Sequence, residues 1–154
     1  MSRNTQSDLS MKVARHLEGV FLQQGEMPID DAFDALDRAE TELTPLVAMD
    51  PELLLELQRR CAEHRFSIAC VRHLSIERIE QFHDQLLHLG FSDIEILVNT
   101  EIKLARQYVR LGKSSAAREI LEKVLLNLDA TSKLGKNPLL RSLSSTVRSL
   151  LREI

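Results

Sequence analysis

The segment from Glu101 to Leu128 constrains the fold more than any other part of the chain, because its apolar residues follow a helical period on both sides of one glycine, Gly112. The apolar positions that share a face are Leu104, Ala105 and Tyr108 before the glycine, and Ala117, Leu121, Val124 and Leu125 after it. Small residues at Ala105 and Ala117 let two helices approach closely. The segment therefore predicts an antiparallel helical hairpin.

The same segment resembles one repeat of the tetratricopeptide family, in which small and large apolar residues hold fixed places in a helix pair of about 34 residues. The matching positions are Leu104, Ala105, Tyr108, Gly112, Ala117 and Leu121; the chain departs from the family at Glu101, where the family prefers tryptophan, and at Asp129, near its closing proline. The resemblance, over residues 95–128, implies stacked helix pairs and a surface that binds a peptide or helix of a partner protein.

The composition indicates a helical protein with an aliphatic core. The chain has 154 residues, of which 44% are hydrophobic, 28% charged and only 4% aromatic. This length fits one domain of ordinary size, and no segment has a useful strand pattern. We therefore expect a single all-α domain over residues 1–154, with six to eight helices in antiparallel hairpins, stacked as a short tetratricopeptide-like solenoid or packed as a compact bundle.

Local start and stop signals divide the chain into helices. The first expected helix begins at Asp8 or Ser10 and ends near Gln24, and the second begins at Asp30 and stops or kinks at Pro45. The third begins at Asp50-Pro51, and the fourth covers 76–89 between Ser75 and Gly90. A later helix opens with a Ser92–Glu95 capping box and ends at Leu111, and the last begins at Asn137-Pro138. Whether 51–74 forms one helix or two stays open, because neither Gly nor Pro interrupts it.

Each expected helix has an apolar stripe that predicts its buried face. The stripes include Met11, Ala14, Leu17 and Phe21; Phe33, Leu36, Ala39 and Leu43; Leu57, Cys61, Phe66 and Val71; Ile79, Phe82 and Leu86; and Leu139, Leu140, Leu143 and Val147. The opposite face of the last helix is rich in Ser and Arg, including Ser144 and Arg148. Such a polar outer face is typical of the terminal helix of a stack.

The two cysteines, Cys61 and Cys70, are too few for a disulfide framework and favour a reducing compartment. Each stands three residues before a histidine, His64 or His73, which is a spacing that can chelate zinc on a helix. On one continuous helix the two pairs point in different directions, so buried cysteines beside surface or cap histidines are the alternative interpretation. We expect no bound metal and no cofactor. The chain has no secretory signal core and no membrane span, so we expect a cytoplasmic protein.

Charge is unevenly distributed, although the net charge is only −3. Residues 1–102 carry 9 Lys and Arg against 19 Asp and Glu, whereas residues 103–154 carry 11 against 4. The basic 103–154 surface suggests an alternative function as a nucleic-acid-binding regulator, but the stacking aromatics that favour single strands are missing there except for Tyr108. No phosphate-binding loop or nucleophile elbow is present, so we expect a protein that is not an enzyme.

The leading hypothesis is a protein–protein interaction module acting as an adaptor, chaperone or regulator. The groove candidates are the polar positions of the helix over 92–111: Asn99, Lys103, Arg106, Gln107 and Arg110. Their cations favour an acidic peptide or a carboxylate terminus as the partner. A related hypothesis is a small bacterial chaperone that sequesters one protein, as a homodimer joined through its acidic and basic ends.

Overall fold

The computed structural model describes residues 3–91, 93–131 and 136–154, which form seven helices and no strand. The helices are α1 (Arg3–Gln23), α2 (Ile29–Val47), α3 (Pro51–Val71), α4 (Ile76–Leu89), α5 (Ile94–Arg110), α6 (Ser114–Asp129) and α7 (Pro138–Glu153). The predicted all-α class is confirmed. None of these helices combines the length and apolar character that crossing a bilayer requires.

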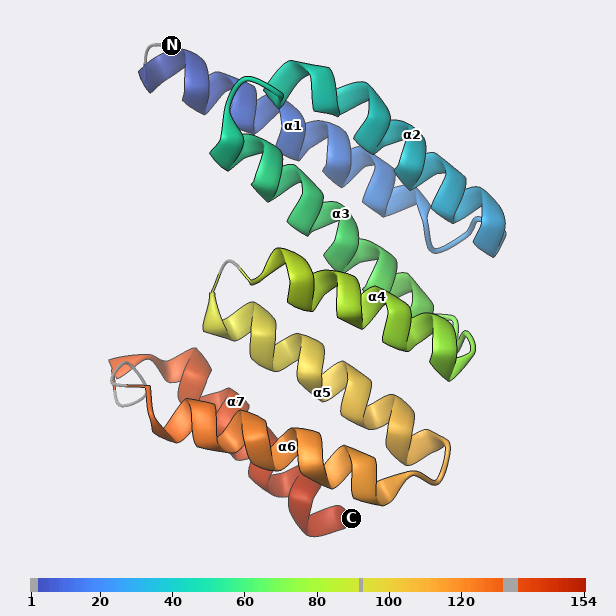
Figure 1. The fold of residues 1–154 in the computed structure, drawn as a ribbon, viewed down its shortest axis with the longest axis vertical. Helices are drawn as coiled ribbons and strands as arrows, with labels where there is room; N and C mark the ends of the chain where they lie inside the picture. Colours follow the sequence, from blue (N-terminus) through green and yellow to red (C-terminus); the bar gives the residue numbers. More distant parts are fainter. Residues whose placement is uncertain (1–2, 92, 132–135) are drawn as a thin grey trace.

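The helices stack as successive antiparallel pairs (Figure 1). Each helix packs on the next in the chain, and the odd-numbered helices also pack on one another in order: α1 on α3, α3 on α5 and α5 on α7. The even-numbered helices α2, α4 and α6 lie beside this row. We call the surface formed by α1, α3, α5 and α7 the odd face, and the surface formed by α2, α4 and α6 the even face.

Most predicted helix ends are confirmed by their hydrogen bonds. The Asp50 carboxylate accepts from the backbone N–H of Glu52 at 3.1 Å, directly before Pro51. Ser75 and Asn137 cap α4 and α7 in the same way. At the other ends of helices, Gly90 and Gly112 have φ values of 79° and 76°, which L side chains rarely adopt.

Two predicted boundaries are different, and a third falls on a residue outside the described part of the chain. Helix α1 already begins at Arg3, so neither Asp8 nor Ser10 caps it. Helix α2 continues through Pro45 to Val47, which is only 1% exposed and packs in the core. Pro45 has no N–H to donate to the carbonyl four residues earlier, and the burial of Val47 offsets the cost of that missing bond. The predicted capping box begins at Ser92, which lies outside the described residues; Asp93 caps α5 by accepting from the Ile96 N–H at 2.9 Å.

The core consists of three clusters of buried side chains that follow the order of the helices. The first joins α1, α2 and the first half of α3; the second joins the second half of α3 to α4 and to Leu104 of α5; the third joins α5, α6 and α7. The open question about residues 51–74 is settled, because α3 is one continuous helix from Pro51 to Val71. Adjacent residues of α3, Cys61 and Ala62, belong to different clusters.

The apolar stripes predict most of this core and fail at a few positions. Every predicted position of the α2 stripe is buried. The predicted core residues that are exposed instead are Met11, Val71 and Leu139, at 50%, 71% and 48%. Ser144, expected on the polar outer face of α7, is only 6% exposed. These residues lie near helix ends or at the edges of apolar stripes, where burial depends on the position of the neighbouring helix rather than on the helix's own sequence.

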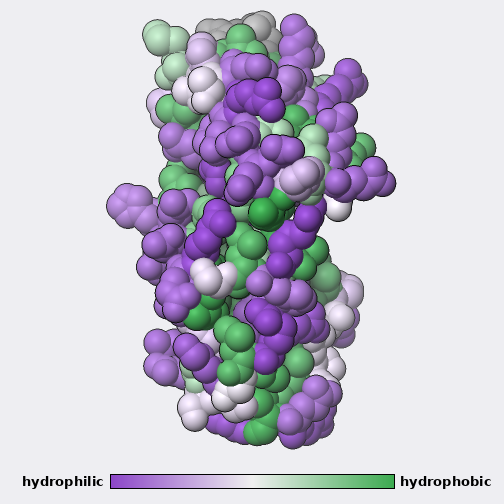
Figure 2. All heavy atoms as spheres, turned by 90° about the vertical axis from the view of Figure 1, so that its right-hand side faces the viewer, coloured by the Kyte–Doolittle hydropathy of each residue, from purple (hydrophilic) through white to green (hydrophobic). Residues whose placement is uncertain are grey.

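Polar side chains connect the turns of successive hairpins. Arg72, which follows α3, donates to the backbone oxygens of Gln24, Gly25 and Met27 in the α1–α2 turn, at 2.6 to 3.2 Å. Figure 2 faces the edge where the α1–α2, α3–α4 and α5–α6 turns lie, and it shows hydrophobic side chains scattered among hydrophilic ones. Arg72 therefore fixes one hairpin against the next at the surface.

Candidate functional site

The odd face has a concavity of about 470 Å³ to which three helices contribute. Its lining residues are Ala14, Glu18 and Phe21 from α1, Arg60, Glu63, His64 and Ser67 from α3, and Lys103 from α5. We call it the odd-face groove. Because the odd-numbered helices pack side by side, the groove crosses the helix axes rather than lying inside one hairpin.

An aromatic pair lies in this groove. The rings of Phe21 and His64 are stacked, with centroids 3.8 Å apart. Burial, with a smaller effect from Lys103, lowers the pKa of His64 to about 4. The imidazole is therefore neutral at pH 7. Its Nε2 atom is buried and has no hydrogen-bond partner within the described residues.

Charged groups of both signs surround the aromatic pair. Glu18 and Glu63 are acidic, whereas Arg60 and Lys103 are basic. Burial raises the pKa of Glu63, an effect that nearby Arg60 opposes. The Lys103 ammonium donates to the Ser67 hydroxyl at 3.3 Å. The groove thus offers donors, acceptors and an aromatic surface, which is a mixture suited to a peptide rather than to a simple anion.

A second concavity on the odd face, of about 150 Å³, lies mainly between α5 and α7. It is lined by Ala105, Arg106, Val109, Leu121, Leu150, Glu153 and Ile154. Apolar side chains predominate, and the guanidinium-bearing Arg106 is the cation among them. Since α5 contributes to both concavities, Lys103 and Arg106 place basic groups in two hollows of one face.

The structure separates the five groove residues predicted from sequence. Lys103 lines the odd-face groove, Arg106 lines the smaller concavity, and Asn99 and Arg110 are exposed without lining either. Gln107, expected to be exposed, is buried at 8% exposure. Its amide donates to the Cys70 backbone oxygen at 3.2 Å and accepts from the Arg110 Nε at 3.1 Å. Gln107 therefore connects α5 to the end of α3.

Sequence reasoning missed most of the odd-face groove. Phe21 was assigned to an apolar stripe and His64 to a Cys–His pair, and the groove residues Glu18, Arg60 and Glu63 were not predicted as site residues. Helical phase places each of them near the edge of its own helix face. Which of these residues come into contact depends on the positions of α1, α3 and α5 along one another's axes, and no local sequence pattern determines those positions.

The two Cys–His pairs are not brought together. Cys61 and Cys70 are buried on one unbroken helix, and His73 lies beyond its end. Burial raises the pKa of the Cys61 thiol to about 12 and that of Cys70 to about 11, so both are protonated at pH 7. Within the described residues, no group of three or more His, Cys, Asp or Glu side chains is placed to hold a metal ion.

Net charge also differs between the odd-numbered and the even-numbered helices. The odd-numbered helices contain 12 Lys and Arg against 8 Asp and Glu, a net charge of +4. The even-numbered helices contain 4 against 12, a net charge of −8. The odd-numbered helices are therefore net positive and the even-numbered helices are net negative.

Comparisons with protein-family models, with curated proteins and with solved structures give no match to this chain. The candidate site therefore rests on the geometry and charge of the chain's own residues.

Proposed function

We propose that this protein is a non-catalytic protein–protein interaction module, an adaptor, chaperone or regulator, which binds a peptide or helix of a partner on its odd face. The observation that carries the proposal is the odd-face groove, to which α1, α3 and α5 all contribute. A segment lying across these helices could contact all three at once, and such a site is typical of helical-repeat proteins.

The resemblance to tetratricopeptide repeats supports the same proposal. Members of that family bind peptides or helices in a groove formed by the first helices of successive pairs, and here the odd-numbered helices are those first helices. Ala105 and Ala117, which carry the likeness, are buried at 1% and 0% exposure in one cluster between packed helices. The two buried free cysteines are compatible with a cytoplasmic location.

The net positive charge of the odd-numbered helices favours an acidic partner segment. Lys103 and Arg106 are the exposed cations that line the two concavities of this face. Arg110 is less suitable for a binding test, because its Nε supports buried Gln107. The sharpest test therefore reverses Lys103 and Arg106 together.

The experiment uses a photo-crosslinking amino acid at Ser67, in the odd-face groove, and at Ser115 on the even-numbered helix α6, each in the native host. We expect a protein adduct from Ser67 that is absent from Ser115. The double variant K103E/R106E should lose that adduct. The control R38E/K123E makes the same change in charge on α2 and α6 and should keep it.

Two results would contradict the proposal: adducts of equal yield from both positions, or equal loss in both double variants. A nucleic-acid adduct at Ser67, with affinity falling steeply as salt rises, would favour the nucleic-acid alternative instead. Thermal unfolding of each variant checks that the fold is retained.

A further inference from the structure

The even face has a groove of its own, of about 480 Å³, between α2 and α4 and above α3. It is lined by Glu40 from α2, Gln58, Ala62 and Arg65 from α3, and Asp84, Gln85, His88 and Leu89 from α4. We call it the even-face groove. It shares no lining residue with the odd-face groove, so the two can be occupied and tested separately.

Aromatic contacts connect α2 and α4, the two helices on either side of the even-face groove. The rings of Phe33 on α2 and Phe82 on α4 stack with centroids 5.3 Å apart, and the Arg78 guanidinium lies 5.1 Å from the centre of the Phe33 ring. These contacts therefore link the two helices that form the walls of the groove.

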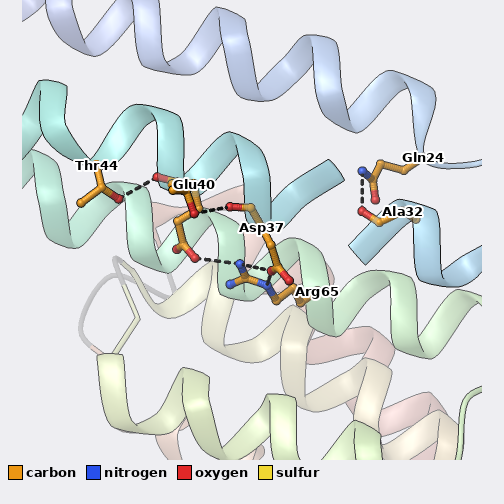
Figure 3. A network of polar contacts seen from close by, with 7 residues as sticks. Gln24, Ala32, Asp37, Glu40, Thr44 and Arg65 are labelled. Carbon is orange, nitrogen blue, oxygen red and sulfur yellow. Dashed lines mark hydrogen bonds and ion pairs between the residues drawn. The ribbon is translucent and has the colours of Figure 1, made fainter. Parts of the chain in front are cut away.

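The cation inside the groove is already paired. The Arg65 guanidinium donates to Asp37 at 2.8 Å and to Glu40 at 2.7 Å, and its side chain is only 14% exposed (Figure 3). Helices α2 and α4 together contain 9 Asp and Glu against 2 Lys and Arg, and Asp84 lines the wall opposite Glu40. These two helices are therefore net negative, while α3 adds Arg65 and also Arg59, whose guanidinium donates to the backbone oxygen of Leu89 at 3.0 Å.

We propose that the even-face groove is a second docking surface, which accepts a Lys- or Arg-bearing segment of another protein. Charge complementarity selects this occupant: a basic side chain entering the groove meets the Asp84 carboxylate on α4, opposite the Glu40 carboxylate that accepts from Arg65. Combined with an acidic segment on the odd face, this would let one molecule bridge two partners of opposite charge.

A second copy of this chain fits the groove less well. The positively charged helices α5 and α7 belong to the odd face, whereas the acidic groove lies on the even face. In a dimer with a twofold axis, both copies use the same surface patch. For the basic helices of one copy to enter the acidic groove of the other, that patch would have to include both the odd face and the even face. A contact between the odd face of one copy and the even face of the next would instead produce an open chain of copies.

The test uses a randomised peptide library displayed on phage, selected on the wild-type protein. The variant Q85W fills the groove without changing charge, and Q81W adds the same bulk at an exposed position of α4 that does not line it. We expect the selected peptides to be rich in Lys and Arg. As synthetic peptides they should bind Q85W at least about tenfold more weakly than Q81W.

Charge is tested with a second matched pair. D84N removes one carboxylate from the groove, and E77Q removes one from an exposed position of the same helix outside it. D84N should weaken the selected peptides more than E77Q does, and raising the salt concentration should weaken binding in all variants. K103E/R106E should leave this binding unchanged, which separates it from the odd-face function.

Several outcomes would overturn the proposal while leaving the odd-face function intact. They are selected peptides without net positive charge, equal binding to Q85W and Q81W, equal effects of D84N and E77Q, or no peptide sensitive to Q85W. Sedimentation adds one more: a wild-type dimer that Q85W converts to a monomer would make a second copy the occupant.

Discussion

The α3–α4 and α5–α6 hairpins turn in the same way but use different residues to do so. After each first helix, one residue adopts a positive φ: His73, at 52°, after α3, and Gly112, at 76°, after α5. The matching hydrogen bonds run from Leu74 N to Ala69 O at 3.0 Å and from Lys113 N to Tyr108 O at 2.8 Å. Only the second turn has the glycine that this backbone conformation favours.

The interiors of the two hairpins differ as well. Phe66 fills the α3–α4 core at 1% exposure, whereas Ala105 and Ala117 lie in the α5–α6 core among aliphatic side chains. One hairpin is filled by a bulky ring and the other has small residues where its helices pack. The shared feature is therefore the hydrogen-bond pattern, so a sequence search for a sister repeat with glycine at the turn misses α3–α4.

The largest expected effect tests the aromatic filling of the first hairpin. Phe66→Ala should lower the free energy of unfolding by about 3–5 kcal/mol, because it leaves a cavity between α3 and α4. Chemical denaturation measures the change. Val71→Ala, at an exposed position of the same helix, should change stability by less than about 0.5 kcal/mol. A loss under about 1 kcal/mol for Phe66→Ala would mean that the ring does not support the hairpin.

The opposite substitution tests the second hairpin. Ala117→Leu should destabilise the protein by about 1–3 kcal/mol, because the added side chain forces packed helices apart. The same denaturation experiment applies, with exposed Ser115→Leu on α6 as the control. If the two leucine variants are equally stable, the α5–α6 contact has room to spare and the resemblance to a tetratricopeptide repeat loses its structural support.

Acid should weaken the two hairpins unequally, because α3 contains His64 and the segment 94–129 contains no histidine. The pKa of His64 in the folded state is about 4, below the 6.5 of a free histidine. Its contribution to stability is therefore complete above pH 6.5 and is lost as the pH falls toward 4. Hydrogen exchange should show α3 losing protection before α5.

The matching variant is His64→Phe, which retains an aromatic ring beside Phe21 but cannot be protonated. The stability lost between pH 7 and pH 4.5 should shrink by about 1–2 kcal/mol, less than the full pKa shift implies because solvent screens a partly exposed group. His88→Gln, at an exposed position, should keep the wild-type pH profile. An unchanged profile for His64→Phe would assign the acid sensitivity to other groups.

The smallest effect concerns the turns themselves. His73→Gly should stabilise the protein by about 0.5–1 kcal/mol and Gly112→Ala should destabilise it by a similar amount, since only glycine adopts positive φ without steric cost. The space around Gly112 is open, so its substitution tests the backbone alone. Thermal unfolding measures both, and changes of the same sign would show that contacts rather than φ decide the difference.

Local chemistry explains what could be predicted from the sequence. Asp50-Pro51, Ser75 and Asn137-Pro138 each satisfy backbone groups within three residues, so their signals do not depend on the rest of the fold. The stripe of α2 is equally local in origin. The failures, at Pro45 and at the start of α1, are places where a recognised signal is weaker than the packing or helix propensity around it.

The site could not be predicted in the same way. Lys103 and Arg106 were identified because they are polar on an apolar helix, but Phe21 and His64 are separated by 43 positions and meet only through the packing of α1 on α3. Gln107 was misassigned for the complementary reason: a polar residue can be buried when a backbone oxygen, here that of Cys70, needs a partner.

Helix α3 contributes to two core clusters, which meet between Cys61 and Ala62, so both clusters depend on this one helix. Cutting the chain between α2 and α3 would not release two self-sufficient pieces, since the larger fragment would start with a helix whose leading half has lost its cover at Leu57 and Cys61. Unfolding of the α1–α2 hairpin should therefore spread into the α3–α4 hairpin through α3. A shortened protein without α1 and α2 would need polar residues at Leu57 and Cys61 to stay soluble.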